Sequence, residues 1–120
     1  MGLVPATIRV AIDIKPGEDP ATIQPESHGL IPVAILSSEA FNAPAMVDRS
    51  TLTFGHTGDE HSLAFCSGAA DVNHDGLPDL ICHFYTQQTG FDVGDTEGVL
   101  KGKTVTNVHL EGQDEIRIVR

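Results

Sequence analysis

The chain has little positive charge, few aromatic residues and no tryptophan. Seven Lys and Arg residues stand against 17 Asp and Glu residues in 120, which gives a formal net charge of −10. Because nucleic acids and anionic membranes are bound by cationic surfaces, this balance argues against both as partners and favours cations as ligands. The scarcity of aromatic residues also weakens a sugar-binding role, which normally uses exposed aromatic side chains.

Long apolar runs are missing as well. No run approaches the roughly 18 residues that a membrane-spanning helix needs, so we expect no membrane insertion. The start of the chain, MGLVPATIRV, lacks the basic residues and the apolar stretch of a signal peptide. If the protein is exported, we expect its signal to have been trimmed or to lie upstream.

Cysteine is scarce: Cys66 and Cys82 are the only two, which is too few for a disulfide-based scaffold. They flank an acidic loop, and a bridge between them would close a loop of about 15 residues and stabilise the fold by about 3 kcal/mol. The alternative is a pair of buried thiols. The bridge is the favoured interpretation provided that the protein is exported.

The chain has the length of one domain, and its 12 Gly and 7 Pro residues favour turns over long helices. The segment TIRVAIDI alternates apolar and polar residues, as a half-buried strand does, and LIPVAIL is apolar throughout. Further strands are expected near residues 50–54, 63–66, 79–86, 98–105, 107–110 and 115–120. Seven or eight short strands separated by turns predict an all-β antiparallel sandwich, a single domain over residues 1–120.

Few helical residues are expected. At most one helical turn is predicted around Ala21–Ile23, in a loop rich in Pro and Gly. A second short helix is predicted to begin at Ser37 or Ser38 and to be stopped by the NAP sequence at residues 42–44. Pro32 cannot donate to a β-ladder, so we expect it at the start of its strand or at a bulge.

The stretch AADVNHDGLPDLICHF, residues 69–84, matches the spacing D-x-[DN]-x-[DN]-G-x-x-D, the first half of a calcium-binding loop. Ca²⁺ takes six to eight oxygen ligands at about 2.3–2.6 Å, and alternating oxygen-bearing side chains converge on one ion only if the chain curls tightly. Gly76 permits the sharp turn. The predicted ligands are the side chains of Asp71, Asn73, Asp75 and Asp79 and the backbone carbonyl of Leu77.

The motif departs from an EF-hand at its twelfth position, where Cys82 stands in place of a bidentate Glu. The residues around it read as a strand, so the remaining ligands must come from water or from elsewhere in the chain. We expect Asp95 and Glu97, in the second acidic turn FDVGDTEG, to supply them. The alternatives are that this second turn binds its own ion or is simply solvated, and that the first loop is an Asx-rich turn without metal. Other acidic candidates are Asp13, Glu18, Asp19 and Asp92.

Other site chemistry has less support. Six histidines raise the alternative of a zinc site, but none of them pairs at the H-x-x-x-H or H-x-E spacing that is typical of zinc ligands. His56 and His61 form the only plausible local pair. The chain has no nucleophile elbow and no phosphate-binding glycine loop. Paired carboxylates in so acidic a chain are better explained by a metal than by glycosidase chemistry, so we expect no enzymatic activity.

Five segments in fixed order are spread over the chain from Ile12 to Val119: IDIKPGEDPATIQPESHGLIPVAIL, VDRSTLTFG, DVNHDGLPDLICHFYTQQTG, GDTEG and LEGQDEIRIV. Together they resemble an accessory module found in many exported multidomain proteins of bacteria and archaea. The acidic loop alone is also similar to the calcium loops of dockerins and FG-GAP repeats. The resemblance implies an extracellular β-module without catalysis of its own, appended to enzymes or surface proteins.

The resemblance also bears on individual residues. It implies that the motif residues of the first loop are ligands, and it matches Asp95 and Glu97 to the GDTE segment. Members of the family often have a cysteine pair near GDTE and EG-D, where this chain has Val99, Leu100 and Gln113. On that basis Cys66 and Cys82 are left as the only possible bridge.

Two functional hypotheses follow. The first is a noncatalytic, calcium-stabilised structural or adhesive module of a secreted or cell-surface protein. The second is a calcium-dependent carbohydrate-binding module appended to a polysaccharide-active enzyme. The expected partners are calcium together with a polysaccharide or another surface protein domain.

Overall fold

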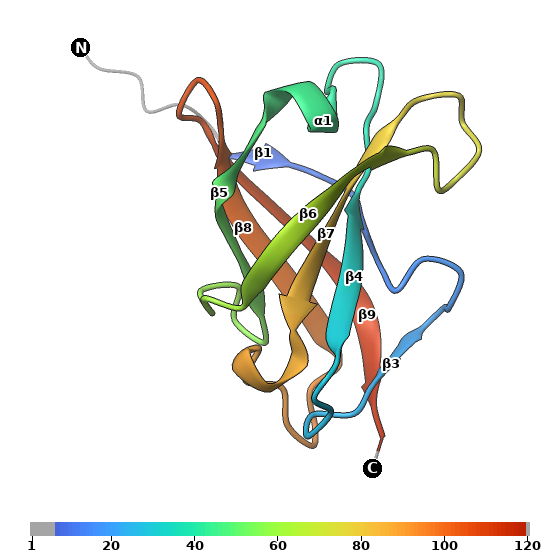
Figure 1. Ribbon diagram of the computed structural model, residues 1–120, viewed down its shortest axis with the longest axis vertical. Helices are drawn as coiled ribbons and strands as arrows, with labels where there is room; N and C mark the ends of the chain where they lie inside the picture. Colours follow the sequence, from blue (N-terminus) through green and yellow to red (C-terminus); the bar gives the residue numbers. More distant parts are fainter. Residues whose placement is uncertain (1–6, 120) are drawn as a thin grey trace.

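The computed structural model describes residues 7–119, which form two β-sheets stacked on each other (Figure 1). These residues form nine strands, one four-residue helix and one turn of 3₁₀ helix. In chain order the elements are β1 (Ile8–Arg9), β2 (Ile12–Ile14), β3 (Ala21–Ile23), β4 (Leu30–Ile35), α1 (Ala43–Met46), β5 (Val47–Gly55), β6 (Leu63–Ala70), β7 (Asp79–Tyr85), η1 (Thr86–Gln88), β8 (Glu97–Thr104) and β9 (His109–Ile118).

The first sheet contains β1, β9, β8 and β5 in that order, with β3 also paired to β9. The second sheet contains β2, β4, β7 and β6. The pairs β1–β9 and β3–β9 are parallel, and the other pairs are antiparallel. The all-β sandwich predicted from the sequence is therefore confirmed, with nine strands in place of seven or eight and with two parallel pairs.

The segment TIRVAIDI, predicted as one strand, contributes to both sheets. Ile8 pairs with Leu110 in the first sheet, and Ile12 pairs with Ile35 in the second. Between them the chain crosses from one sheet to the other, and Val10 stays buried at the crossing. The alternation predicts which side chains are buried, but it does not predict which sheet the backbone joins.

Both helix predictions are wrong. Residues Ala21–Ile23 form strand β3, which pairs with the end of β9. Helix α1 begins after Asn42 instead of being stopped there, because the Asn42 side chain accepts a hydrogen bond from Ala45 N–H. Pro44 lies in the first turn, where a missing N–H costs nothing. Within residues 7–119 no helix has the length and apolar character needed to cross a membrane.

Pro32 lies inside β4, opposite His83 and in unbroken register with β7, and not at the strand start or at a bulge as predicted. Its carbonyl accepts a hydrogen bond from Lys15 N–H, just beyond the last residue of β2. In an antiparallel ladder the N–H and C=O of one residue point to the same neighbour. The missing N–H of Pro32 would therefore face the Lys15 carbonyl, which accepts from Glu18 N–H instead, so that carbonyl is not left unpaired.

The core lies between the inner faces of the two sheets. Phe54 from β5 packs against Phe84 from β7 with ring centroids 4.9 Å apart, and against Phe91 at 5.7 Å. Gly98 on β8 lies beside this cluster, and a Cβ atom there would come within 2.8 Å of Ile14 Cδ1. A larger residue at position 98 would therefore force the Ile14 side chain to shift.

Candidate metal centre

The predicted calcium loop connects β6 to β7 at one end of the second sheet (Figure 1). Carboxylate oxygens of Asp71, Asp75 and Asp79 lie within 4.8 Å of one another. Two ligands of one Ca²⁺ ion are separated by at most about twice the 2.3–2.6 Å ligand distance, so these three oxygens can contact a single ion. The structure thus brings together the three carboxylates that the spacing predicted.

Asn73 lies beside two of these carboxylates. In the amide orientation that satisfies its hydrogen bonds, its NH₂ donates to Asp71 Oδ1 and to Asp75 Oδ1, both at 3.0 Å. A bound cation would favour the opposite orientation, with the amide oxygen turned toward the ion, so the role of Asn73 as a ligand stays a prediction.

The Asp71 carboxylate organises the turn. It accepts hydrogen bonds from the backbone N–H groups of Asp75, at 3.2 Å, and Gly76, at 2.8 Å. Burial opposes the ionisation of Asp71, but hydrogen bonds from these and neighbouring groups outweigh it and lower the pKa of Asp71 below its usual value. Gly76 has φ +87°, in the left-handed region that favours glycine, so its predicted role in the turn is confirmed.

Asp79, the first residue of β7, is fully buried. Its Oδ1 accepts from Ser37 N–H at 2.8 Å and its Oδ2 from Val72 N–H at 3.0 Å. Among the described residues no Lys, Arg or His forms an ion pair with it. Each oxygen keeps a second lone pair, and a buried carboxylate without a cationic side chain is stabilised by a bound metal.

Ser37 is the residue of this region that the sequence analysis missed. Its hydroxyl donates to Pro78 O at 2.7 Å and accepts from Ala43 N–H at 2.9 Å, while its own N–H donates to Asp79. Ser37 therefore ties the loop to the end of β4 and to the start of α1. No local spacing could have shown this, since Ser37 and Asp79 are 42 residues apart in the chain.

Leu77 lies in the loop as the motif places it, and it is half-buried. Its N–H donates to Asp75 Oδ1 at 2.9 Å, which holds the second half of the turn against the carboxylate cluster. The role of the Leu77 carbonyl as a ligand stays a prediction.

Asp95 and Glu97, which were predicted to complete the calcium site, are not brought to it. They follow the other end of β7, and a strand of seven residues at about 3.3 Å per residue separates the two regions by about 20 Å (Figure 1). Asp95 Oδ2 instead accepts from Asp92 N–H at 2.8 Å and closes a local turn. Glu97 begins β8 and pairs with Glu115.

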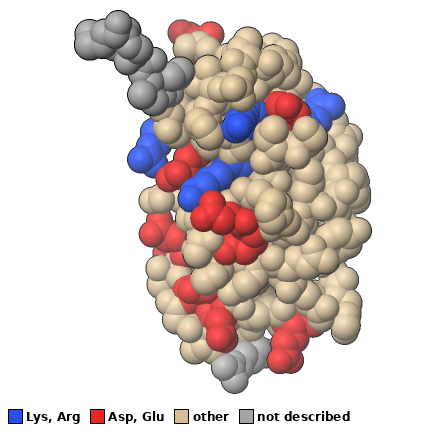
Figure 2. All heavy atoms as spheres, turned by 90° about the vertical axis from the view of Figure 1, so that its left-hand side faces the viewer, with Lys and Arg blue, Asp and Glu red and all other residues tan. Residues whose placement is uncertain are grey.

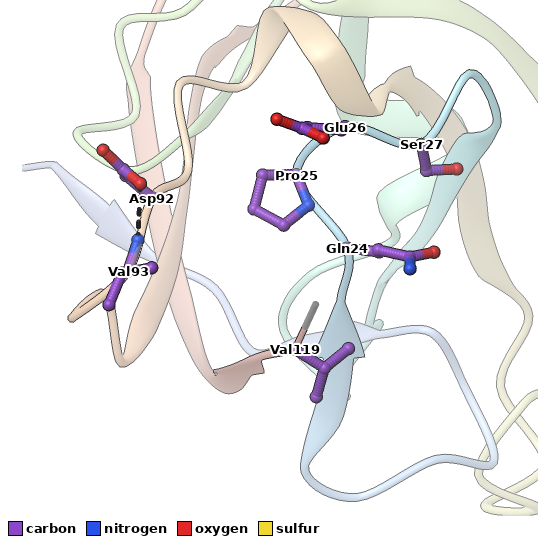
Figure 3. A pocket seen from close by; sticks show the side chains of 7 residues that line it. All are labelled: Gln24, Pro25, Glu26, Ser27, Asp92, Val93 and Val119. Carbon is purple, nitrogen blue, oxygen red and sulfur yellow. Dashed lines mark hydrogen bonds between the residues drawn. The ribbon is translucent and has the colours of Figure 1, made fainter.

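The second acidic turn borders a cavity of about 390 Å³ at this other end of the molecule (Figure 3). Two carboxylates, those of Asp92 and Glu26, come to the cavity from separate segments. Asp92 Oδ1 accepts from Val93 N–H at 2.7 Å. Neither carboxylate belongs to a group of three metal-ligating side chains within residues 7–119, so a second metal site gains no support here.

Of the two histidines considered as zinc ligands, His56 lies beside a carboxylate of its own turn. His56 Nε2 lies 3.3 Å from Glu60 Oε2, in the turn between β5 and β6. Glu60 also accepts the N–H groups of Thr57 and Gly58 and so closes that turn. In the part of the chain that the structure describes, no histidine belongs to a group of three metal-ligating side chains.

Cys66 and Cys82 form a disulfide between directly paired residues of β6 and β7. The favoured interpretation of the two cysteines is therefore confirmed, and the alternative of two buried thiols is wrong. These are the strands that the acidic loop connects, so the bridge closes the hairpin that carries the candidate metal centre.

Comparisons of the chain with protein-family models, curated proteins and solved structures find no match. The resemblance to an accessory module of exported proteins thus stays a prediction that rests on its five segments.

Proposed function

We propose that the chain is a noncatalytic accessory module, structural or adhesive, of a secreted or cell-surface protein, and that a calcium ion in the β6–β7 loop stabilises it. One observation carries this proposal: three carboxylates converge within 4.8 Å of one another in a loop of nine residues, 71–79, beside the Asn73 amide. Such a cluster is self-repelling unless a cation joins it.

The ligand chemistry supports calcium among the possible cations. The cluster offers carboxylate and amide oxygens, and no thiolate or imidazole belongs to it, which disfavours zinc and copper. Mg²⁺ requires a near-ideal octahedron at about 2.0–2.1 Å and usually keeps several waters, whereas Ca²⁺ accepts irregular sets of six to eight oxygens. A flexible loop of alternating Asp and Asn side chains suits the larger ion.

One further feature supports an extracellular location. The Cys66–Cys82 disulfide is of a kind that persists in oxidising compartments. The absence of a catalytic role is supported by the lack of any recognised catalytic motif in the sequence.

The proposal predicts that calcium raises thermal stability. An ion bound only by the folded state contributes about 2.7 kcal/mol at 100 times its dissociation constant. At an unfolding entropy of about 2.1 cal/mol/K per residue, this corresponds to a shift of about 10 °C for a chain of this length.

The experiment is a thermal melt of the protein in EDTA, in excess Ca²⁺ and in excess Mg²⁺. We expect Tm to fall in EDTA, to recover fully with Ca²⁺ and to recover only partly with Mg²⁺. A melting curve that is identical in EDTA and in millimolar Ca²⁺ would exclude a stabilising calcium site.

A further inference from the structure

The solvent-facing side of the second sheet differs from that of the first in its charge. Strands β4, β6 and β7 contain one charged residue, Asp79, and its side chain is buried beside the metal loop. The edge strand β2 of the same sheet adds Asp13, which is half-buried. Strands β5, β8 and β9 of the first sheet contain nine charged residues. Figure 2 shows charges of both signs on the side of the molecule that carries β5. In a chain with a net charge of −10, three neighbouring strands without an exposed charge are a specific feature.

Aromatic side chains gather on the outer face of strands β6 and β7. Successive residues of a strand point to opposite faces, so His83 and Tyr85 of β7 share the outer face while Phe84 enters the core. Phe65 of β6 lies opposite His83, with ring centroids 4.6 Å apart and planes 23° apart. Phe65 is 50% exposed and Tyr85 is 46% exposed, which is high for large apolar side chains in a folded domain.

The row continues onto β4 and is held in place by neighbouring groups. Leu30, 39% exposed, lies opposite Tyr85, and Pro32 lies opposite His83. Ser67 Oγ lies 3.1 Å from His83 Nε2, which fixes the imidazole next to the Phe65 ring. Tyr85 and His83 are two residues apart on one strand, or about 7 Å, so the rings form an extended row.

A hollow of about 280 Å³ adjoins Tyr85 at the end of this row. Its lining is polar but uncharged and includes Ser27, His28, Gln87 and Gln88. The Gln87 amide is held by Glu26 O, at 3.0 Å, and lies 3.3 Å from His28 Nδ1. The Gln87 Oε1 atom has no hydrogen-bond partner among residues 7–119, so it is free to accept from a ligand.

We propose that this face, from the hollow beside Tyr85 to Phe65, binds an uncharged polysaccharide. The C–H groups of a sugar ring are weakly positive and pack on the negative faces of aromatic rings. Sugar hydroxyls match fixed amide, imidazole and hydroxyl groups such as those of Gln87, His28 and Ser67. The missing charges on β4, β6 and β7 favour a neutral glycan over an anionic one, because an anionic glycan needs cationic side chains.

This site is separate from the metal centre. Tyr85 ends β7 and Asp79 begins it, so the strand length of about 20 Å separates the hollow from the loop. Glycan binding is therefore expected to persist in EDTA at temperatures where the protein stays folded. Failure of calcium binding and failure of glycan binding are thus distinguishable results.

The test is affinity electrophoresis in native gels that contain one polysaccharide each. The neutral probes are mixed-linkage β-glucan, xyloglucan, xylan, galactomannan and soluble starch, and polygalacturonate is the anionic probe. The variants are Phe65→Ala, Tyr85→Ala and Gln87→Ala. Val105→Ala is the matched control, because Val105 is an apolar side chain, 65% exposed, in the β8–β9 turn. Circular dichroism and melting curves check that each variant is folded.

We expect at least one neutral polysaccharide to retard the wild type and the Val105→Ala control equally. Each of the three site variants is expected to lose about tenfold in affinity, equivalent to about 1.4 kcal/mol. Three results would overturn the proposal: no retardation by any neutral probe, equal retardation of the site variants, or stronger binding to polygalacturonate. A dimer in light scattering that dissociates in the Tyr85→Ala variant would assign the face to a second copy and would also overturn it.

Discussion

The substitution Asp75→Asn changes the charge of the metal loop while keeping its shape. Asp75 is exposed, and its Oδ1 accepts Leu77 N–H at 2.9 Å, a bond that the Asn side-chain oxygen can also accept. The substitution removes one of three carboxylates whose oxygens lie within 4.8 Å of one another. We expect it to have opposite effects on stability with and without calcium.

The magnitudes follow from the geometry. In EDTA the charges on Asp75 and Asp79 repel each other by about 1 kcal/mol at 4.8 Å in a solvent-like dielectric, and Asp71 adds a repulsion of the same sign. Asp75→Asn should therefore be more stable than the wild type in EDTA, by about 1 kcal/mol or about 4 °C. With calcium at 100 times the wild-type dissociation constant, the wild type gains about 2.7 kcal/mol. A variant whose affinity is 100-fold weaker gains only about 0.4 kcal/mol, so the order of the two stabilities reverses.

The assay is a pair of urea or thermal melts of each protein, in EDTA and in Ca²⁺, at low ionic strength. Glu26→Gln is the matched control, because Glu26 is an exposed carboxylate at the other end of the molecule. It should change stability equally in both buffers. The Glu26→Gln control should keep the calcium-dependent gain of the wild type. If Asp75→Asn kept that gain as well, the assignment of Asp75 as a ligand would be refuted.

Two further predictions concern the strands. Burial, followed by repulsion from Asp114 and Asp19, raises the pKa of the Asp13 carboxyl above its usual value, so ionisation of Asp13 destabilises the fold as the pH rises. Asp13→Asn should therefore raise Tm at neutral pH and not near pH 3. Melts at the two pH values check this, and an equal shift at both would contradict it. Replacing both Cys66 and Cys82 by Ala should lower the free energy of unfolding by about 3 kcal/mol, measured in urea without reductant, because their bridge closes a 16-residue separation. An unchanged urea midpoint would show that the bridge contributes nothing.

Much of the fold could be predicted because strand burial is a local property of the sequence. The alternation in TIRVAIDI and the apolar run in LIPVAIL identify the buried side chains that the structure shows. What the pattern could not give is the partner of each strand. The division of the first segment between two sheets and the short strand β3 both depend on pairing with β9, about 100 residues later in the chain.

The helix error has a similar origin. A Pro two residues after Asn42 can stop a preceding helix or occupy the first turn of a following one, and both positions use the same local sequence. The structure chooses the second, because Asn42 caps the new helix and Ser37 accepts the N–H of Ala43. That choice depends on a contact between segments and could not be read from spacing.

The candidate metal centre also has one part that the sequence could predict and one part that it could not. Asp71, Asn73, Asp75 and Asp79 could be predicted because all four belong to one turn, whose geometry the spacing and Gly76 determine. The contribution assigned to Asp95 and Glu97 was wrong, because it required two loops at opposite ends of β7 to meet. The hydrogen bond from Ser37 to Asp79 was missed, since it depends on the pairing of β4 with β7.

The central claim is that one calcium ion binds among the oxygens of the β6–β7 loop. Its most direct test is a crystal structure of the protein grown in calcium, with the ion located by anomalous scattering at long wavelength. The account predicts one strong anomalous peak at about 2.3–2.6 Å from oxygens of Asp71, Asn73, Asp75 and Asp79. A map without a peak in this loop, or with calcium held at the Asp92–Glu97 turn instead, would contradict it.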